Sequence, residues 1–172
     1  YRSLPGQRNI GFVYSCNPAS TSGALRSCPL PLLSELFSVP GTRWFSLQKG
    51  DAAAAIQDYA AKFNNIIDLT AHIEDFGDTA ALLEQLDLLI SVDTSVPHLA
   101  GALGKPVWML LPFANEWRWL LRRSDSPWYP SFRLFRQPGP GQWEAMIGRV
   151  RQALLAANKP FSDRNHIIPT RV

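Results

Sequence analysis

The sequence is poor in cysteine and has no long hydrophobic run. Its 172 residues include two cysteines, Cys16 and Cys28, which are too few for a disulfide framework or a zinc site of their own. No apolar segment has the length of a membrane span and no signal peptide opens the sequence, so we expect a cytoplasmic protein. The three scattered histidines predict no metal site. Because the first residue is Tyr1 rather than Met, we expect a processed chain or a piece of a longer one.

Signatures of several enzyme classes are missing as well. Neither G-x-G-x-x-G nor G-x-x-x-x-G-K-[ST] occurs, which disfavours a dinucleotide-binding protein and a P-loop enzyme, and there is no G-x-S-x-G motif of serine hydrolases. The formal net charge of +3 is too small to indicate nucleic-acid binding. Charge is uneven, however: residues 45–93 hold nine acids and two bases, whereas residues 116–151 hold seven arginines and three acids. The arginine-rich segment also contains Trp117, Trp119, Trp128 and Tyr129, which a solvated surface does not explain.

What the sequence does contain is a regular alternation of short apolar runs and helical segments. The predicted strands are 9–15, 42–47, 66–69, 88–92, 107–111 and 132–135. The predicted helices are 30–39, 51–63 capped by Asp51, 78–86 capped by Asp78 and Thr79, one or two turns around 117–123, and 143–156. This order predicts an α/β fold, a Rossmann-like doubly wound parallel sheet over residues 1–157, followed by an irregular tail at 158–172.

The segment LLISVDTSVPHLAGALGKP at 88–106 is the most informative part of the chain. Its apolar strand leads into Asp93, Thr94 and Ser95, residue types that favour helix N-caps because their side-chain oxygens accept backbone N–H bonds. The helix that follows ends at Gly104. The start of such a helix presents N–H donors that bind an anion, typically a phosphate. A good N-cap without a ligand explains the same pattern.

The place of this segment in the chain favours the anion site. In a doubly wound sheet the ligand crevice lies outside the carboxyl ends of the first and fourth strands, where the strand order reverses. Those ends carry the loop 15–27 and the turn 93–98. His98 lies one helical turn after Thr94 and shares its face. A nucleotide is the ligand most often found in such a crevice, so we predict one here.

Several motifs along the chain occur together in one known family. They are VYSCNP at 13–18, RSCPL at 26–30, SLQKG at 46–50, DTAAL at 78–82, DTSVPHLAGALG at 93–104, WRWLL at 117–121 and SPWYP at 126–130. With them the chain resembles, from about Ile10 to Leu155, the nucleotide-sugar half of the heptosyltransferase-like glycosyltransferases, family 9 of the GT-B class. It is most similar to the variant at the C-terminus of bacterial tetratricopeptide-repeat proteins.

The resemblance implies a two-lobed GT-B enzyme that uses a nucleotide-diphosphate sugar as substrate, without a metal or other cofactor. This chain would be its C-terminal, donor-binding lobe. An N-terminal acceptor lobe and a repeat array on a longer parent chain would be its partners, with no nucleic acid and no membrane span. The catalytic base would belong to the acceptor lobe, so the catalytic residue is unknown and the isolated lobe is expected to be inactive.

The resemblance also implies a set of site residues that line one cleft and bind the donor. They are Ser15, Asn17, Lys49, Asp93, Thr94, Ser95 and His98. Lys49 would offset phosphate charge, and Asp93 would cap the helix or orient a sugar hydroxyl. Trp117, Arg118 and Trp119 would cover the cleft, because arginine pairs with phosphate and tryptophan stacks on sugars and bases. The alternative is that these aromatic residues seal an interface with the missing lobe or the repeat array.

The sequence departs from the family at two positions and leaves two other functions open. Cys16 and Ser95 stand where the family tends to have glycine, and a larger residue there would crowd a phosphate. One alternative is a non-catalytic, glycosyltransferase-like interaction module of a repeat protein. A weaker alternative is a nucleotide-sugar epimerase lobe, which would need Glu74, Asp75 or Asp93 to point into the cleft.

Overall fold

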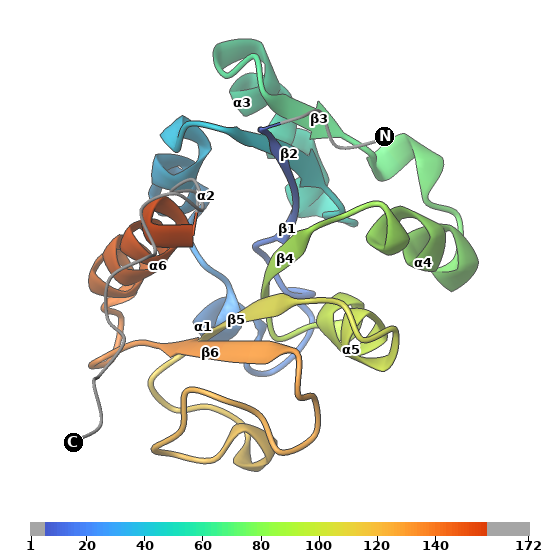
Figure 1. The fold of residues 1–172 in the computed structure, drawn as a ribbon. Helices are drawn as coiled ribbons and strands as arrows, with labels where there is room; N and C mark the ends of the chain where they lie inside the picture. Colours follow the sequence, from blue (N-terminus) through green and yellow to red (C-terminus); the bar gives the residue numbers. More distant parts are fainter. Residues whose placement is uncertain (1–5, 158–172) are drawn as a thin grey trace, which may run out of the picture.

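The six apolar runs form one parallel sheet in the computed structural model, which describes residues 6–157. The strands are β1 (Arg8–Val13), β2 (Thr42–Ser46), β3 (Ile66–Asp68), β4 (Leu88–Val92), β5 (Val107–Leu111) and β6 (Phe132–Arg136). Their order is β3-β2-β1-β4-β5-β6, and every neighbouring pair is parallel. The predicted doubly wound sheet, with its order reversing beside the first strand, is therefore confirmed (Figure 1).

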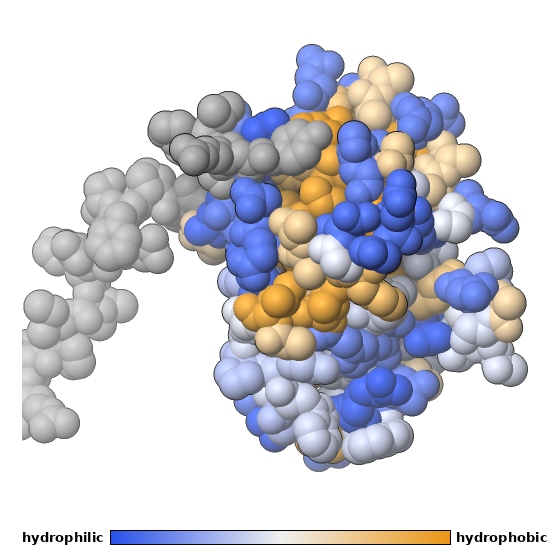
Figure 2. Space-filling model, turned by 90° about the vertical axis from the view of Figure 1, so that its right-hand side faces the viewer, coloured by the Kyte–Doolittle hydropathy of each residue, from blue (hydrophilic) through white to orange (hydrophobic). Residues whose placement is uncertain are grey.

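Helices cover both faces of this sheet. In the described residues the α-helices are α1 (Gly23–Arg26), α2 (Leu30–Leu33), α3 (Ile56–Lys62), α4 (Phe76–Glu84), α5 (Ser95–Ala102) and α6 (Trp143–Ala157). The 3-10 helices are η1 (Ser34–Ser38), η2 (Asp51–Ala55), η3 (Thr70–His72) and η4 (Trp117–Trp119). The helices α2 and α6 lie on one side of the sheet, and α4 and α5 lie on the other (Figure 1). The side of the molecule that carries α4 and α5 shows hydrophobic residues among hydrophilic ones (Figure 2).

Two apolar cores follow from this arrangement, one on each face. Ile10 and Phe12 of β1 pack into the core under α2 and α6, whereas Val13 packs into the core under α4 and α5. Successive strand residues point to opposite faces, so a strand covered on both sides must be apolar almost throughout. All five residues of β4 are buried, including the polar Ser91, so this strand is covered on both faces.

The structure corrects three predicted helices. The helix predicted to start at Asp78 begins two residues earlier, because Asp75 is its N-cap: the Asp75 backbone is extended and its carboxylate accepts the Asp78 N–H. The helices predicted at 30–39 and 51–63 are each divided into an α and a 3-10 segment. Gly104 ends α5 as predicted and has a φ of +69°, which glycine adopts without strain. The predicted tail at 158–172 lies outside the described residues.

The sheet register brings the ends of β1 and β4 together. Ile10 pairs with Leu88 and Val13 with Ser91, so the two strands run side by side to their carboxyl ends. The loop after β1 and the start of α5 therefore face one another. No helix within residues 6–157 has both the length and the apolar character to cross a membrane.

Candidate functional site

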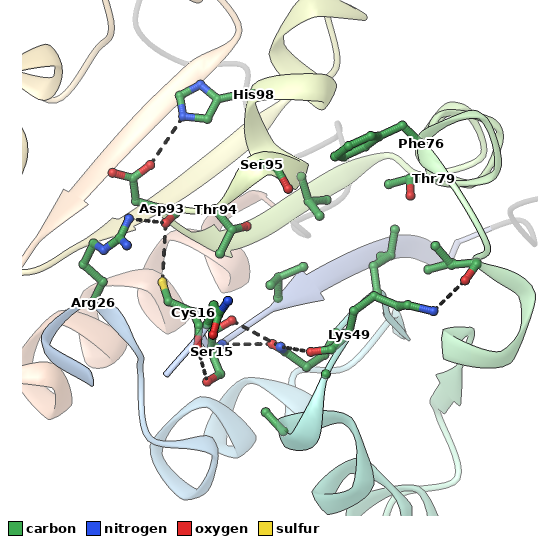
Figure 3. A pocket seen from close by; sticks show the side chains of 18 of the residues that line it. Ser15, Cys16, Arg26, Lys49, Phe76, Thr79, Asp93, Thr94, Ser95 and His98 are labelled. Carbon is green, nitrogen blue, oxygen red and sulfur yellow. Dashed lines mark hydrogen bonds and ion pairs between the residues drawn. The ribbon is translucent and has the colours of Figure 1, made fainter. Parts of the chain in front are cut away.

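A cleft of about 940 Å³ lies at the carboxyl ends of β1, β2 and β4 (Figure 3). The seven residues predicted to bind the donor all line it: Ser15, Asn17, Lys49, Asp93, Thr94, Ser95 and His98. Of the three residues predicted to cover the cleft, Arg118 lines it, whereas Trp117 and Trp119 do not. The tertiary structure thus gathers residues from three separate strand ends around one cavity.

The start of α5 forms one wall of this cleft. Thr94 is the N-cap in extended backbone, with φ −132° and ψ −173°, but its side chain makes no capping hydrogen bond. Its Oγ1 is buried and has no hydrogen-bond partner within the described residues. Because Pro97 in the first turn has no N–H, the amides of Ser95 and Val96 are the first-turn donors that this helix offers. Thr94 occupies the N-cap position, but its hydroxyl makes no hydrogen bond in the part of the chain that the structure describes and does not cap the Ser95 and Val96 amides.

Of the two roles predicted for Asp93, the structure excludes the capping of α5, whereas the orientation of a sugar hydroxyl stays a prediction. Its carboxylate does not cap α5; Oδ2 accepts the indole N–H of Trp119 at 2.9 Å, and Oδ1 lies 3.4 Å from Nε2 of His98. Burial raises the pKa of this carboxyl, but the hydrogen bonds from His98 and Trp119 and the charge of Arg118 outweigh it and leave the pKa below its ordinary value. Asp93 is therefore an ionised, buried group that holds its neighbours in place.

Trp119 is a structural partner of this carboxylate and not a cover of the cleft. Its side chain is fully buried, and it stacks on His98 at 5.5 Å and on Phe132 at 6.0 Å between ring centroids. Trp117, by contrast, is 74% exposed and packs edge-to-face against Trp128. The prediction of a Trp119 lid was wrong because local sequence does not show which tryptophan of the pair turns inward.

Lys49 and Ser15 lie on the wall opposite α5. The Lys49 ammonium donates to the carbonyl of Ile73 at 2.6 Å and to that of Thr70 at 3.4 Å, so it is directed toward η3 (Figure 3). Ser15 Oγ lies 3.3 Å from Ser27 Oγ and bonds the Cys16 carbonyl. These side chains line the cleft but are already engaged within the protein.

Arg26 is a cleft residue to which the sequence analysis gave no role. Its Nη1 donates to the Asp93 carbonyl at 3.0 Å and its Nη2 to Ser20 Oγ at 2.9 Å, whereas its Nε is buried without a partner in the described part of the chain. Arg26 is the one basic residue between Arg8 and Arg43. A single arginine in a polar loop after the first strand was the sequence feature that could have identified it as a site residue. It places a fixed cation beside the start of α5 (Figure 3).

Two other residues shape the loop after β1. The buried Gln48 accepts the N–H groups of Tyr14 and Ser15 with Oε1, at 3.1 and 2.9 Å. The Cys16 thiol is buried against the Asp93 carbonyl at 3.4 Å, and burial raises its pKa. Cys16 and Ser95, which replace expected glycines, both line the cleft. Within residues 6–157, no group of three or more His, Cys, Asp or Glu side chains is placed to hold a metal ion.

Comparison with known proteins agrees with this architecture. The model of glycosyltransferase family 9 (heptosyltransferase) matches residues 44–119. Protein FlbA of Caulobacter vibrioides is 33% identical over 157 residues, a match that covers 87% of this chain and 25% of FlbA. The chain thus spans about a quarter of the length of this curated relative.

Solved glycosyltransferases share the fold at low sequence identity. The Escherichia coli heptosyltransferase WaaC in complex with ADP-2-deoxy-2-fluoro heptose superposes with a TM-score of 0.67 at 16% identity, over 88% of this chain and 44% of WaaC. The E. coli ADP-heptose lipopolysaccharide heptosyltransferase II gives 0.61 at 17% identity, over 91% and 49%. A family 9 glycosyltransferase of Veillonella parvula gives 0.63 at 15% identity, over 88% and 47%. The chain corresponds to about half of each enzyme, one lobe of the GT-B fold.

Proposed function

We propose that this chain, which carries a glycosyltransferase family 9 domain in the form of a single GT-B-like lobe, binds the nucleotide-diphosphate sugar of a metal-independent glycosyltransferase. The diphosphate would lie at the start of α5. There it would accept hydrogen bonds from the Ser95 and Val96 amides, as anions do at helix N-termini. The sugar would extend into the cleft toward Asp93 and His98.

The observation that carries this proposal is a pair of buried polar groups without hydrogen-bond partners, within residues 6–157, at one end of the cleft. Thr94 Oγ1 and Arg26 Nε are both buried without a hydrogen-bond partner among the described residues, and both residues line the same cavity. A buried hydroxyl or guanidinium N–H without a partner costs about 1–3 kcal/mol. A phosphate between them would satisfy the Thr94 hydroxyl and the Arg26 guanidinium together, with the charge-assisted geometry that arginine favours.

Such a site would stabilise the leaving group of sugar transfer. As the glycosidic bond to the donor breaks, negative charge grows on the departing diphosphate. Fixed amides, the Arg26 guanidinium and the Arg118 guanidinium on the facing wall would offset that charge without a metal. We assign acceptor binding and the catalytic base to an N-terminal lobe outside this chain, since the chain covers 44–49% of the matched enzymes. We further propose a cytoplasmic parent chain, because both cysteines are free thiols. The tetratricopeptide-repeat array, which rests on the sequence resemblance alone, is also part of this proposal.

Calorimetric titration of the chain with ADP, UDP, GDP and their common sugar conjugates tests this proposal. ADP is the first ligand to try, because WaaC has been solved with ADP and with an ADP-heptose analogue. We expect micromolar binding of one nucleotide. Loss of binding in a Thr94→Ala, His98→Ala double variant would locate the nucleotide in this cleft. Absence of binding by every nucleotide would contradict the proposal.

Single variants sharpen the test. Thr94→Val replaces the hydroxyl with a methyl group of similar size, and we expect about tenfold weaker binding, whereas Thr94→Ser keeps the hydroxyl and should bind nearly as well. Arg26→Gln should weaken binding at least as much, because it removes a cation beside the diphosphate. Thr21→Val is the matched control, since Thr21 is exposed and does not line the cleft. Equal losses in Thr21→Val and Thr94→Val would mean that the effect is unspecific.

A non-catalytic interaction module remains the second candidate. It is favoured by the exposed apolar side chains of Trp117, Leu121 and Trp128, which are 74%, 75% and 57% exposed. Such a module would ignore every nucleotide in the titration. The epimerase alternative is less favoured, because two of its three candidate acids, Asp75 and Asp93, have carboxylates engaged in bonds within the chain, although Glu74 also lines the cleft.

A further inference from the structure

His98 holds an unusual position at the edge of the cleft, because both of its ring nitrogens face a hydrogen-bonding side chain. Its Nε2 lies 3.4 Å from Oδ1 of Asp93, and its Nδ1 lies 3.1 Å from the hydroxyl of Tyr129. The ring is also stacked on Trp119. With 29% of its side chain exposed, His98 is in contact with solvent and able to exchange protons.

The two partners of His98 are compatible with both of its charge states. The ionised Asp93 carboxylate only accepts, so Nε2 carries a hydrogen in either state. The Tyr129 hydroxyl donates or accepts. It donates to Nδ1 when the ring is neutral, and it accepts from Nδ1–H when the ring is charged. His98 can therefore gain a proton without losing a hydrogen bond.

Contacts on both sides of the Tyr129 ring hold its hydroxyl next to His98. The Tyr129 N–H bonds Ser126 Oγ at 3.3 Å, and its ring stacks on Phe132 with centroids 4.6 Å apart. On its other side the ring packs against α5 at Gly101, where a Cβ atom would come within 2.5 Å of Tyr129 Cδ1. A glycine at this position lets the phenol approach the helix that carries His98.

Charged groups face the cleft around His98 from several elements. Asp93, at the end of β4, favours a charged ring. Arg26 in α1 and Arg118 in η4, both on the cleft wall, oppose it, and Tyr129 before β6 faces the ring with its hydroxyl. Among the other charged residues that line the cleft, Lys49 is basic, whereas Asp51, Glu74 and Asp75 are acidic. A bound diphosphate adds negative charge and neutralises the two arginines, which shifts the balance toward the charged ring.

We propose that Tyr129 is a positioning residue that lets His98 take up a proton from solvent when a nucleotide diphosphate fills the cleft, so that donor binding is coupled to proton uptake. This inference rests on the proposed function. The charged imidazolium would then add a cation next to the diphosphate that the empty protein does not hold. His98 would act through its charge, because its two nitrogens remain bonded to Asp93 and Tyr129.

Calorimetric titration of the chain with ADP in two buffers tests this proposal. PIPES and Tris differ strongly in their heat of ionisation and contain no phosphate that would compete with ADP, so proton uptake appears as a difference between the two apparent binding enthalpies. We expect wild-type chain at neutral pH to take up a fraction of a proton per ADP. His98→Gln should bind ADP with no uptake. Tyr129→Phe should lose most of the uptake, because the charged ring would then have an N–H without an acceptor.

A control and a direct observation complete the design. Tyr14→Phe removes another phenol hydroxyl, bonded to the Ala52 carbonyl, and should leave the uptake unchanged. Nitrogen-15 NMR of the His98 ring should show a neutral ring in the free chain and a larger charged fraction with ADP. ADP binding without a buffer-dependent enthalpy, or uptake that survives in His98→Gln, would overturn this inference and leave the proposed function intact. Unchanged uptake in a folded Tyr129→Phe variant would overturn the role of Tyr129. Absence of ADP binding in both buffers would overturn both proposals.

Discussion

The two strand ends that form the cleft are built in opposite ways. At the end of β1, the backbone amides of Tyr14 and Ser15 are satisfied by Gln48, and the amide of Cys16 is satisfied by Ser27 Oγ at 2.9 Å. At the end of β4, the Thr94 side chain makes no capping bond and its hydroxyl is unpartnered within residues 6–157. The first end is closed by neutral side chains of this chain. The second is left open and is surrounded by charged groups.

This difference separates a half of the cleft whose polar groups are satisfied within the chain from a half that, under the proposed function, would bind the ligand. Buried polar groups in folded proteins are nearly always hydrogen-bonded, so an exception in a cavity needs an explanation. The β1 end satisfies its donors internally and so gains stability. The β4 end lacks this stabilisation at the Thr94 hydroxyl, and binding sites are commonly less stable than the scaffold around them.

The largest effect on stability is expected from Gln48→Ala, which removes the side-chain acceptor at the β1 end. The substitution leaves two buried amides, those of Tyr14 and Ser15, without acceptors. We expect a loss of about 3 kcal/mol in the free energy of unfolding, measured by urea denaturation. Gln57→Ala is the matched control, since Gln57 is exposed, and it should change stability by less than about 0.5 kcal/mol. A loss in Gln48→Ala as small as the control's would show that the β1 end is not closed by this side chain.

Asp93→Asn tests the charged character of the β4 end. We expect the free energy of unfolding to fall by about 2 kcal/mol at neutral pH, because a charge-assisted bond to Trp119 and the pairing with His98 are weakened. The folded pKa of Asp93 is lowered, so the carboxylate stabilises the protein above the ordinary value of about 4 and this contribution is lost as pH falls through the folded pKa. The difference between wild type and Asp93→Asn should therefore shrink in urea melts below about pH 4. The loss of stability in Gln48→Ala comes from uncharged hydrogen bonds, so it should stay the same at low pH. A pH-independent Asp93→Asn loss would remove the electrostatic contrast between the two strand ends.

A smaller effect is expected from Ser27→Ala on the β1 end. Ser27 Oγ accepts the Cys16 N–H and donates to the Gly23 carbonyl at 2.8 Å. Their loss should lower the free energy of unfolding by about 1 kcal/mol in the same assay. Nucleotide affinity should change little, because Ser27 does not line the cleft. A large loss of affinity without a loss of stability would place Ser27 in the ligand site instead.

The smallest and opposite effect is expected from Thr94→Val. In the free chain this change removes a buried hydroxyl without a partner, so the thermal midpoint should stay the same or rise, by an amount that corresponds to about 0.5 kcal/mol. Weaker nucleotide binding and undiminished stability in the same variant would mark the hydroxyl as a ligand group. A clear loss of stability would mean that the hydroxyl has a structural partner, and the contrast between the two strand ends would fail.

Much of the fold could be read from the sequence, because strands and helices leave local patterns. The run at 88–92 is apolar except for Ser91, since β4 is covered on both faces, and the alternation of strands and helices implied the strand order. Helix starts were less predictable. Asp75 and Asp78 are equally good caps by residue type, and only the extended backbone at Asp75 decided between them.

The site was predictable in its location and not in its contacts. The order of strands placed Thr94 and Ser15 at neighbouring strand ends, so the sequence by itself determined where the cleft would lie. Tertiary structure decided that Trp119 turns inward to Asp93 and that Arg26 reaches the Asp93 carbonyl, across separations of 26 and 67 residues. It also decided that Tyr129 reaches His98 from 31 residues away. Local propensity and periodicity describe residues a few positions apart, whereas these pairs depend on how the loops after β1 and β5 pack over the sheet.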